Sequence, residues 1–291
     1  MILITGATGH YGKATIDFLL KKGISANNIS ALVRDEAKAA DLKAKGISLK
    51  IGDYDDYNSL LAALEGVDKL LLISGSDIFN RSKQQLNVVN AAKETGVKHL
   101  LYTSFERKNE TETSPIAMVA KSHLDTEIAI KESGIPYTIF RNNLYLDVLP
   151  LFWGETVLET GVFFPAGETK SAFALRNDMA EATANVLITD GHENKDYTIA
   201  NVENVSLKDV TDSINKVTGR NIAYISPSID VYSDTLTKAG VPAEYIQMFA
   251  GFGEAIKQGE FTSDETDLEH LLGRKPTSAA EYLAQLYSVK N

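Results

Sequence analysis

The chain has 291 residues, 44% of them hydrophobic, and a formal net charge of −10. This length allows one large domain or a domain with a smaller lobe, and the acidic balance argues against nucleic acid as the main partner. The lack of cysteine excludes disulfides and thiolate chemistry, and the five scattered histidines suggest no metal site. The apolar runs are strand-sized and no leader pattern opens the chain, so we expect a cytoplasmic protein without a membrane span.

The first half of the chain alternates short apolar segments with segments of helical spacing. Strands are predicted at residues 1–5, 29–33, 47–51, 67–73, 97–103 and 137–140. Helices are predicted between them at 11–22, 36–45, 57–64, 80–95 and 116–133. Strands that are joined through helices form a parallel sheet covered on both faces. The pattern therefore predicts an α/β fold, a Rossmann-type doubly wound sheet of strand order 3-2-1-4-5-6.

The regular alternation of strands and helices ends after residue 143. Residues 144–161 are apolar and aromatic without a clean period. Further elements are predicted as strands at 162–164, 196–200 and 222–225, helices at 177–189 and 206–218, and mostly helix from 231 to 289. We therefore expect a Rossmann domain over 1–143 and a smaller α/β lobe over 144–291, interleaved with the first domain and carrying the substrate.

A glycine-rich segment joins the first strand to the first helix. It consists of Gly6, Ala7, Thr8, Gly9, His10, Tyr11 and Gly12. Glycines at such a junction allow a tight turn, close approach of a pyrophosphate to the backbone, and close packing of helix and strand. The GxxGxxG spacing differs from the GxGxxG of ordinary dehydrogenases. The alternative, an ordinary glycine-rich turn, is disfavoured by the strand before the segment and the helix after it.

The second strand ends at Arg34, which bears on the choice of cofactor. An acidic residue at this place binds the ribose 2′-hydroxyl of NAD, whereas an arginine accommodates the 2′-phosphate of NADP. The position of Arg34 favours a contact with the 2′-phosphate of NADPH over the alternative of a solvated arginine without a ligand. The neighbouring Asp35 leaves NAD as an alternative cofactor.

Polar or glycine residues also follow the other strands, where ligands of open α/β sheets bind. These are Asp53 and Tyr54; Ser74, Gly75 and Ser76; Ser104 and Phe105; and Arg141, Asn142 and Asn143.

Several segments together resemble a known family. ITGATGHYGK, LLLISGS, VKHLLYTS and GIPYTIFRNNLY are similar to the NmrA-like branch of the atypical short-chain dehydrogenases, and within it to the bacterial NAD(P)H:quinone oxidoreductases. The resemblance covers nearly the whole chain and implies NADPH as the cofactor. The contacts it implies are Gly6 to Tyr11, Arg34, Ser74 to Ser76, Thr138, Ile139, Phe140, Arg141, Asn142, Asn143 and Lys170.

The resemblance also shapes the expected chemistry. The usual acid of short-chain dehydrogenases is a tyrosine four residues before a lysine, but Ala117 stands at that distance from Lys121. Carbonyl reduction needs a positioned proton donor, whereas a reduced quinone is stable enough to take its proton from solvent. Lys121 is a candidate donor or cofactor contact, against the alternative of a solvated helix lysine, and His123 is a weaker candidate donor.

Aromatic residues supply candidate walls for a flat quinone ring. These are Phe105, Tyr145, Phe152 and Trp153, and the alternative for each is core packing. We therefore expect an NADPH-dependent reductase that transfers hydride directly to quinones without a flavin. The alternative is a redox-sensing regulator that binds NAD(P) without turnover, and the sequence leaves a homodimer open.

Overall fold

A parallel sheet of seven strands forms the centre of the protein, in the order β3-β2-β1-β4-β5-β6-β8. The computed structural model describes residues 1–288. The strands are β1 (Ile2–Ile4), β2 (Ile29–Val33), β3 (Ser48–Ile51), β4 (Lys69–Ile73), β5 (His99–Phe105), β6 (Tyr137–Asn142) and β8 (Lys195–Ile199). Every neighbouring pair is parallel. The Rossmann order predicted for the first six strands is confirmed, and β8 extends it.

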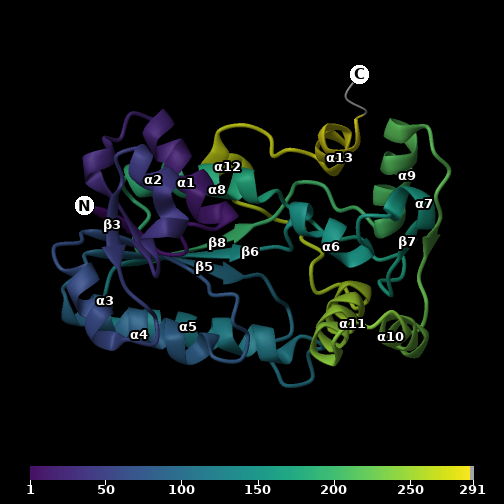
Figure 1. Ribbon diagram of the computed structural model, residues 1–291, viewed down its shortest axis with the longest axis horizontal. Helices are drawn as coiled ribbons and strands as arrows, with labels where there is room; N and C mark the ends of the chain where they lie inside the picture. Colours follow the sequence, from purple (N-terminus) through teal and green to yellow (C-terminus); the bar gives the residue numbers. More distant parts are fainter. Residues whose placement is uncertain (289–291) are drawn as a thin grey trace.

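Helices cover both faces of this sheet (Figure 1). One face carries α1 (His10–Lys21), α2 (Ala40–Ala44), α8 (Arg176–Ile188) and α12 (Leu268–Leu272), and the other carries α3 (Tyr57–Leu64), α4 (Arg81–Glu94) and α5 (Ala117–Ser133). Short 3₁₀ turns lie at η1 (Ala26–Asn28) and η2 (Glu36–Ala39). Neighbouring strand residues such as Leu3 and Ile4 belong to the cores on opposite faces. The central strands β1, β2 and β4 are largely apolar because both of their faces are buried.

The second half of the chain returns to this sheet. Helix α8 packs against α1, and β8 pairs with β6 so that Thr138 lies opposite Lys195 and Asn142 opposite Ile199. The sequence predicted a strand at residues 196–200 but not the strand with which it pairs, because the spacing of apolar residues carries no information on strand pairing. Residues beyond 143 thus supply a strand and two helices to the central layers.

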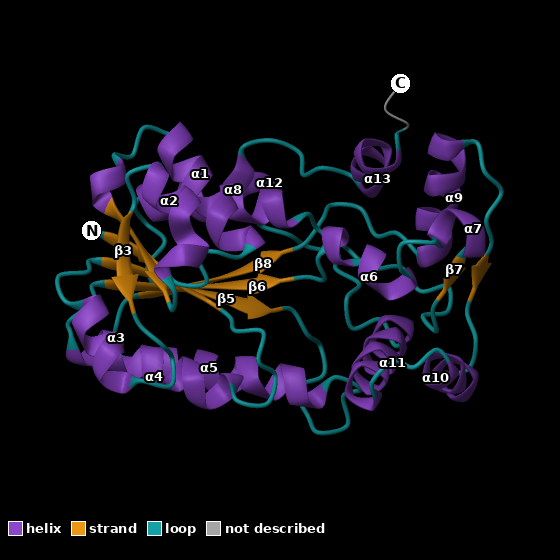
Figure 2. Cartoon of the chain, viewed as in Figure 1, coloured by secondary structure: helices purple, strands orange, loops and turns teal. Residues whose placement is uncertain are grey.

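The remaining elements form a lobe beyond the carboxyl ends of β5, β6 and β8 (Figure 2). It contains the two-stranded sheet of β7 (Val162–Phe163) and β9 (Tyr224–Ile225). Its helices are η3 (Leu146–Val148), α6 (Pro150–Trp153), α7 (Val157–Thr160), α9 (Leu207–Thr218), α10 (Ile229–Lys238), α11 (Ala243–Lys257) and α13 (Ala279–Tyr287). Across residues 1–288, no helix has the length and apolar character needed to span a membrane.

Candidate functional site

The glycine-rich segment forms a tight loop between β1 and α1. Gly6 adopts φ +56°, a left-handed conformation that favours glycine, and the Gly9 N–H donates to the Gly6 carbonyl over 3.0 Å. A Cβ atom on Gly12 would lie 2.5 Å from the Gly6 oxygen, whereas one on Gly9 would lie 3.2 Å from it. Gly12 is therefore required for the helix to approach the loop, and Gly9 leaves the outer side of the turn bare.

The first turn of α1 is open to a ligand. Its N-cap residue is Gly9, which has no side chain to cap the helix, and Thr8, Gly9 and His10 are exposed. Backbone N–H groups at an uncapped helix N-terminus, together with the helix dipole, favour a phosphate. The loop backbone therefore fits a dinucleotide pyrophosphate.

Two residues of the segment serve the core through their side chains. The Tyr11 hydroxyl lies 2.8 Å from Thr183 Oγ1 and donates to the Met179 carbonyl over 3.2 Å, which ties α1 to α8. Burial raises the pKa of Tyr11, so its hydroxyl keeps its proton. Ala7 is also buried. Both can offer a ligand only their backbone.

The end of β2 presents a free cation. Arg34 is exposed, and within residues 1–288 it forms no ion pair. Asp35 is occupied instead, because its Oδ1 accepts the Ala37 N–H over 2.9 Å and caps η2. One carboxylate oxygen of Asp35 is thus used within the chain, and Arg34, the residue suited to a 2′-phosphate, is available.

The segment after β4 is held by its backbone. The Ser74 N–H donates to Thr103 Oγ1 over 2.9 Å, and the Gly75 N–H donates to Gln85 Oε1 over 3.1 Å. Ser76 is exposed. The carboxyl ends of the strands border a crevice in which ligands of such sheets bind. These bonds fix the edge of that crevice beside the glycine-rich loop, since β4 pairs with β1.

The predicted residues of β6 divide by position. Thr138, Ile139 and Phe140 have no exposed surface inside the sheet, and the Thr138 hydroxyl donates to the His192 carbonyl over 2.7 Å. Their side chains do not reach the crevice, because a ligand meets the end of a strand and not its middle.

At the end of β6, Asn142 and Asn143 differ in which of their side-chain atoms have hydrogen-bond partners. Asn142 Nδ2 donates to the Tyr145 hydroxyl over 3.4 Å, while its buried Oδ1 has no partner within residues 1–288. Asn143 is fully engaged, with Nδ2 donating to Glu106 Oε2 over 2.6 Å and Oδ1 accepting the Leu144 N–H. In the described part of the chain, Asn142 therefore keeps a buried acceptor without a partner at the end of β6, whereas the bonds of Asn143 fix the turn of the chain.

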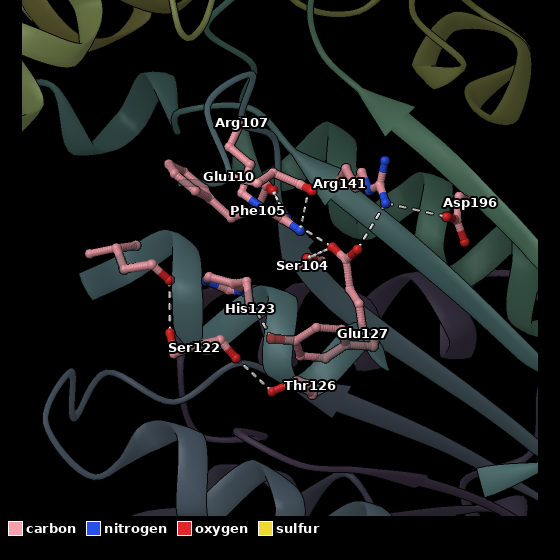
Figure 3. A network of polar contacts seen from close by, with 12 residues as sticks. Ser104, Phe105, Arg107, Glu110, Ser122, His123, Thr126, Glu127, Arg141 and Asp196 are labelled. Atoms are coloured by element: carbon pink, nitrogen blue, oxygen red, sulfur yellow. Dashed lines mark hydrogen bonds and ion pairs between the residues drawn. The ribbon is translucent and has the colours of Figure 1, made fainter. Parts of the chain in front are cut away.

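A buried ion cluster joins β5, β6 and α5 (Figure 3). Glu127 accepts from Ser104 Oγ over 2.5 Å, from Arg107 Nη1 over 2.9 Å and from Arg141 Nη2 over 2.8 Å. Burial alone would raise the pKa of Glu127, but Arg107, Ser104 and Arg141 together hold it below its ordinary value. Arg141 also lies 3.4 Å from Asp196 on β8, so its charge serves this cluster. The sequence gave no sign of the cluster, because its members are far apart in the chain.

The two predicted lysines lie on the surface. Lys121 is 67% exposed in its side chain and pairs with Asp125 at 2.8 Å, one helical turn away. That bond raises the pKa of Lys121 and makes it a weaker acid. Lys170 pairs with Asp209 at 3.5 Å, in the second lobe. The structure does not bring either ammonium group to the glycine-rich loop.

The four aromatic candidates separate into two pairs. Phe152 stacks on Phe164 at 4.6 Å between ring centroids, and Trp153 donates to the Tyr287 hydroxyl, so both belong to the core of the second lobe. Tyr145 is half-buried, with its ring 6.5 Å from that of Tyr11, and Phe105 is half-buried at the end of β5. Phe105 and Tyr145 are thus the two candidates that lie at strand ends and keep some exposed surface.

A largely apolar cavity of about 530 Å³ adjoins the crevice. It lies between the segment after β4, the start of α5 and helix α11. Its lining includes Ser76, Phe79, Met118, Val119, Met248 and Phe252. Sequence reasoning missed this wall, because α11 lies more than a hundred residues from the other two segments in the chain.

The parallel sheet and the uncapped glycine-rich loop define a Rossmann-type dinucleotide-binding protein. The chain belongs to the NmrA-like family, whose model matches residues 1–283. It is 38% identical over 292 residues to quinone oxidoreductase 2 of Escherichia coli strain K12, with all of both chains covered.

Two solved structures are similar over almost the same extent. The crystal structure of the E. coli NADPH-dependent quinone oxidoreductase QOR2 complexed with NADPH gives a TM-score of 0.91 at 37% identity, covering 99% of this chain and 100% of that one. The Citrobacter sp. triphenylmethane reductase complexed with NADP(H) gives 0.90 at 35% identity, with the same coverage. The family resemblance read from the sequence is confirmed.

Proposed function

We propose that the protein is an NADPH-dependent oxidoreductase that reduces quinones by direct hydride transfer without a flavin. The observation that carries the proposal is its full-length similarity to a quinone oxidoreductase with NADPH bound, at a TM-score of 0.91. The site agrees with it, because the glycine-rich loop has no side-chain cap and Arg34 at the end of β2 is exposed.

Three groups of this chain would hold the cofactor, which supplies the hydride. The first-turn N–H groups of α1, around Gly9, face the pyrophosphate. Arg34 binds the 2′-phosphate, since it has a free guanidinium and Asp35 is engaged in a cap. The Oδ1 of Asn142 has no partner among residues 1–288 but is buried, so it would accept from a donor such as the carboxamide of the nicotinamide only once the side chains that cover it move aside.

The acceptor occupies the apolar cavity beside Ser76. Its walls suit a flat, conjugated molecule, and the two similar structures are of proteins named for quinones and for triphenylmethane dyes. Both acceptor classes are conjugated and electron-poor, so both can accept a hydride without a strong acid. Ala117 stands where a catalytic tyrosine is usual, so the rate would depend mainly on how the protein orients the acceptor over the nicotinamide.

A redox sensor without turnover is the competing function. The apolar cavity beside the segment after β4 favours the enzyme, because a sensor has no need of an acceptor site there. The test is NADPH consumption by the purified protein, with no added flavin, against a panel of benzoquinones and naphthoquinones. We expect quinone-dependent oxidation of NADPH. Tight NADPH binding with no oxidation by any quinone would favour the sensor.

A further inference from the structure

A chain of buried hydrogen bonds leads from the crevice to His123. The Gly75 N–H can only donate, so its bond to Gln85 Oε1 fixes the orientation of the Gln85 amide. Gln85 Nε2 therefore donates, to the Tyr102 oxygen over 3.1 Å and to Thr126 Oγ1 over 2.7 Å. The crevice loop thus sets the direction of the bonds behind it.

This direction favours one tautomer of His123. The Tyr102 oxygen accepts from Gln85, and the contact best placed to receive its own proton is His123 Nδ1, which lies 2.7 Å away. Nδ1 is then an acceptor, and the ring proton lies on Nε2. Burial, with the charges of Arg81 and Arg107 adding to it, puts the pKa of His123 well below its ordinary value, so the ring is neutral.

The Nε2–H group lies across the ring from the Nδ1 atom that faces Tyr102. Within residues 1–288 it has no hydrogen-bond partner, and unlike His99 Nδ1 it is not sealed from solvent, although only 3% of the residue is exposed. The Phe105 ring stacks on His123 at 5.7 Å between ring centroids, and Figure 3 shows the two side chains next to each other. Val119, one turn earlier on α5, lines the apolar cavity, as does Phe252, which packs on Phe105.

The same wall carries an unpaired cation. Arg81 is 6% exposed and donates to Ser122 Oγ over 2.9 Å, and at longer distance to the carbonyls of Gly75 and Val119. Within residues 1–288 no carboxylate pairs with it, whereas buried charges are ordinarily paired. A positive charge beside Gly75 and Val119 favours an anion that forms in the adjoining space.

We propose that the neutral Nε2–H group of His123 donates a hydrogen bond to a quinone oxygen as that oxygen becomes negatively charged. This inference rests on the proposed function. In the step, the C4–H bond of the dihydronicotinamide breaks and its electron pair enters the quinone with the hydrogen nucleus, which leaves NADP⁺ and a hydroquinone monoanion. A proton from water completes the hydroquinone.

His123 keeps its own proton in this step. To give it up, the ring would have to take the Tyr102 proton on Nδ1, and burial raises the pKa of Tyr102 so that a phenolate is unfavourable there. The residue therefore acts by stabilising charge, as a donor in an oxyanion hole does. Losing one such donor typically lowers kcat by about 100-fold to 1,000-fold.

The kinetic test compares two variants with wild type at saturating NADPH. His123→Phe removes the donor, and kcat for a soluble naphthoquinone should fall about 100-fold, while the NADPH dissociation constant stays within about threefold. His123→Gln places an amide N–H near the Nε2 position and should stay within about tenfold of wild type. Circular dichroism and thermal unfolding check that both variants fold.

An inactive wild type would overturn the proposed function and this inference together. An active wild type with a His123→Phe variant within about threefold in kcat, or with equal losses in both variants, would overturn this inference alone. Imidazole ¹⁵N NMR of the wild-type protein tests it without any variant. The resonances should show a protonated Nε2 and a bare Nδ1 for His123 at neutral pH; a protonated Nδ1 would contradict the assignment.

Discussion

Replacing Arg34 with alanine should remove the preference for NADPH over NADH. Arg34 is exposed, so its attraction to a phosphate acts through water, where two unit charges 4 Å apart gain about 1 kcal/mol. A phosphate monoester carries about −1.5 to −2 charges near neutral pH, which gives about 2 kcal/mol. At about 1.4 kcal/mol for each factor of ten, NADPH should bind about 30-fold more weakly to the variant.

Titration calorimetry with both cofactors measures this effect. The dissociation constant for NADH should change by less than about threefold, since NADH lacks the phosphate. Arg220→Ala, which removes an exposed arginine from the second lobe, is the matched control and should leave both affinities unchanged. Added salt should narrow the wild-type preference, because exposed charges are screened. Equal affinities for NADPH and NADH in the wild type would refute the reasoning.

Three further changes test other parts of the site. Gly9→Val should abolish NADPH binding by calorimetry while circular dichroism shows a folded protein, because the side chain fills the bare side of the loop; undiminished affinity would give the loop another role. Lys121→Ala should keep kcat for a quinone within about tenfold at saturating NADPH, since its ammonium pairs with Asp125 on the surface; a loss of 100-fold or more would make it a catalyst. Glu127→Gln should lower the free energy of unfolding by about 1.5 to 3 kcal/mol in denaturant titrations, because Arg107 and Arg141 lose a shared buried carboxylate but keep Glu110 and Asp196, whereas the exposed Glu132→Gln should not.

The Glu127 cluster also sets a pH dependence. The folded-state pKa of Glu127 lies below its ordinary value of 4.5, so the folded state binds this proton less readily than the unfolded chain does. Its contribution to stability is complete above about pH 5 and is lost as the pH falls through the folded-state pKa. Denaturant titrations between pH 7 and 3 should show Glu127→Gln approaching wild-type stability at the acid end; a constant difference would contradict this.

The sequence predicted the central sheet because its signals were local. Apolar strands that alternate with amphipathic helices predict the order of the first six strands. The loop with glycines at 6, 9 and 12 is recognised from the strand before it and the helix after it. Arg34 could be placed because it directly follows a well-defined strand. The pairing of β8 with β6 could not be predicted in this way, since nothing in residues 195–199 indicates the strand with which they pair.

The acceptor side of the site depends on tertiary contacts and was predicted less well. Phe152 and Trp153 looked like ring walls because large aromatic side chains serve pockets and cores equally, and only packing shows that they belong to the core. Helix periodicity did not separate the exposed Lys121 from the inward-facing His123, two residues later on α5. The bonds that orient His123 come from Gln85 and Tyr102, on two other elements.

Transient kinetics with stereospecifically deuterated NADPH tests direct hydride transfer to a quinone. Flavin-free protein with bound NADPH is mixed with a naphthoquinone under anaerobic conditions, and the single turnover is followed by NADPH absorbance. The account predicts a primary isotope effect for deuterium on one C4 face and none for the other, with one hydroquinone formed per NADPH. Oxidation that requires added flavin, or a rate that is indifferent to deuterium on both faces, would contradict it.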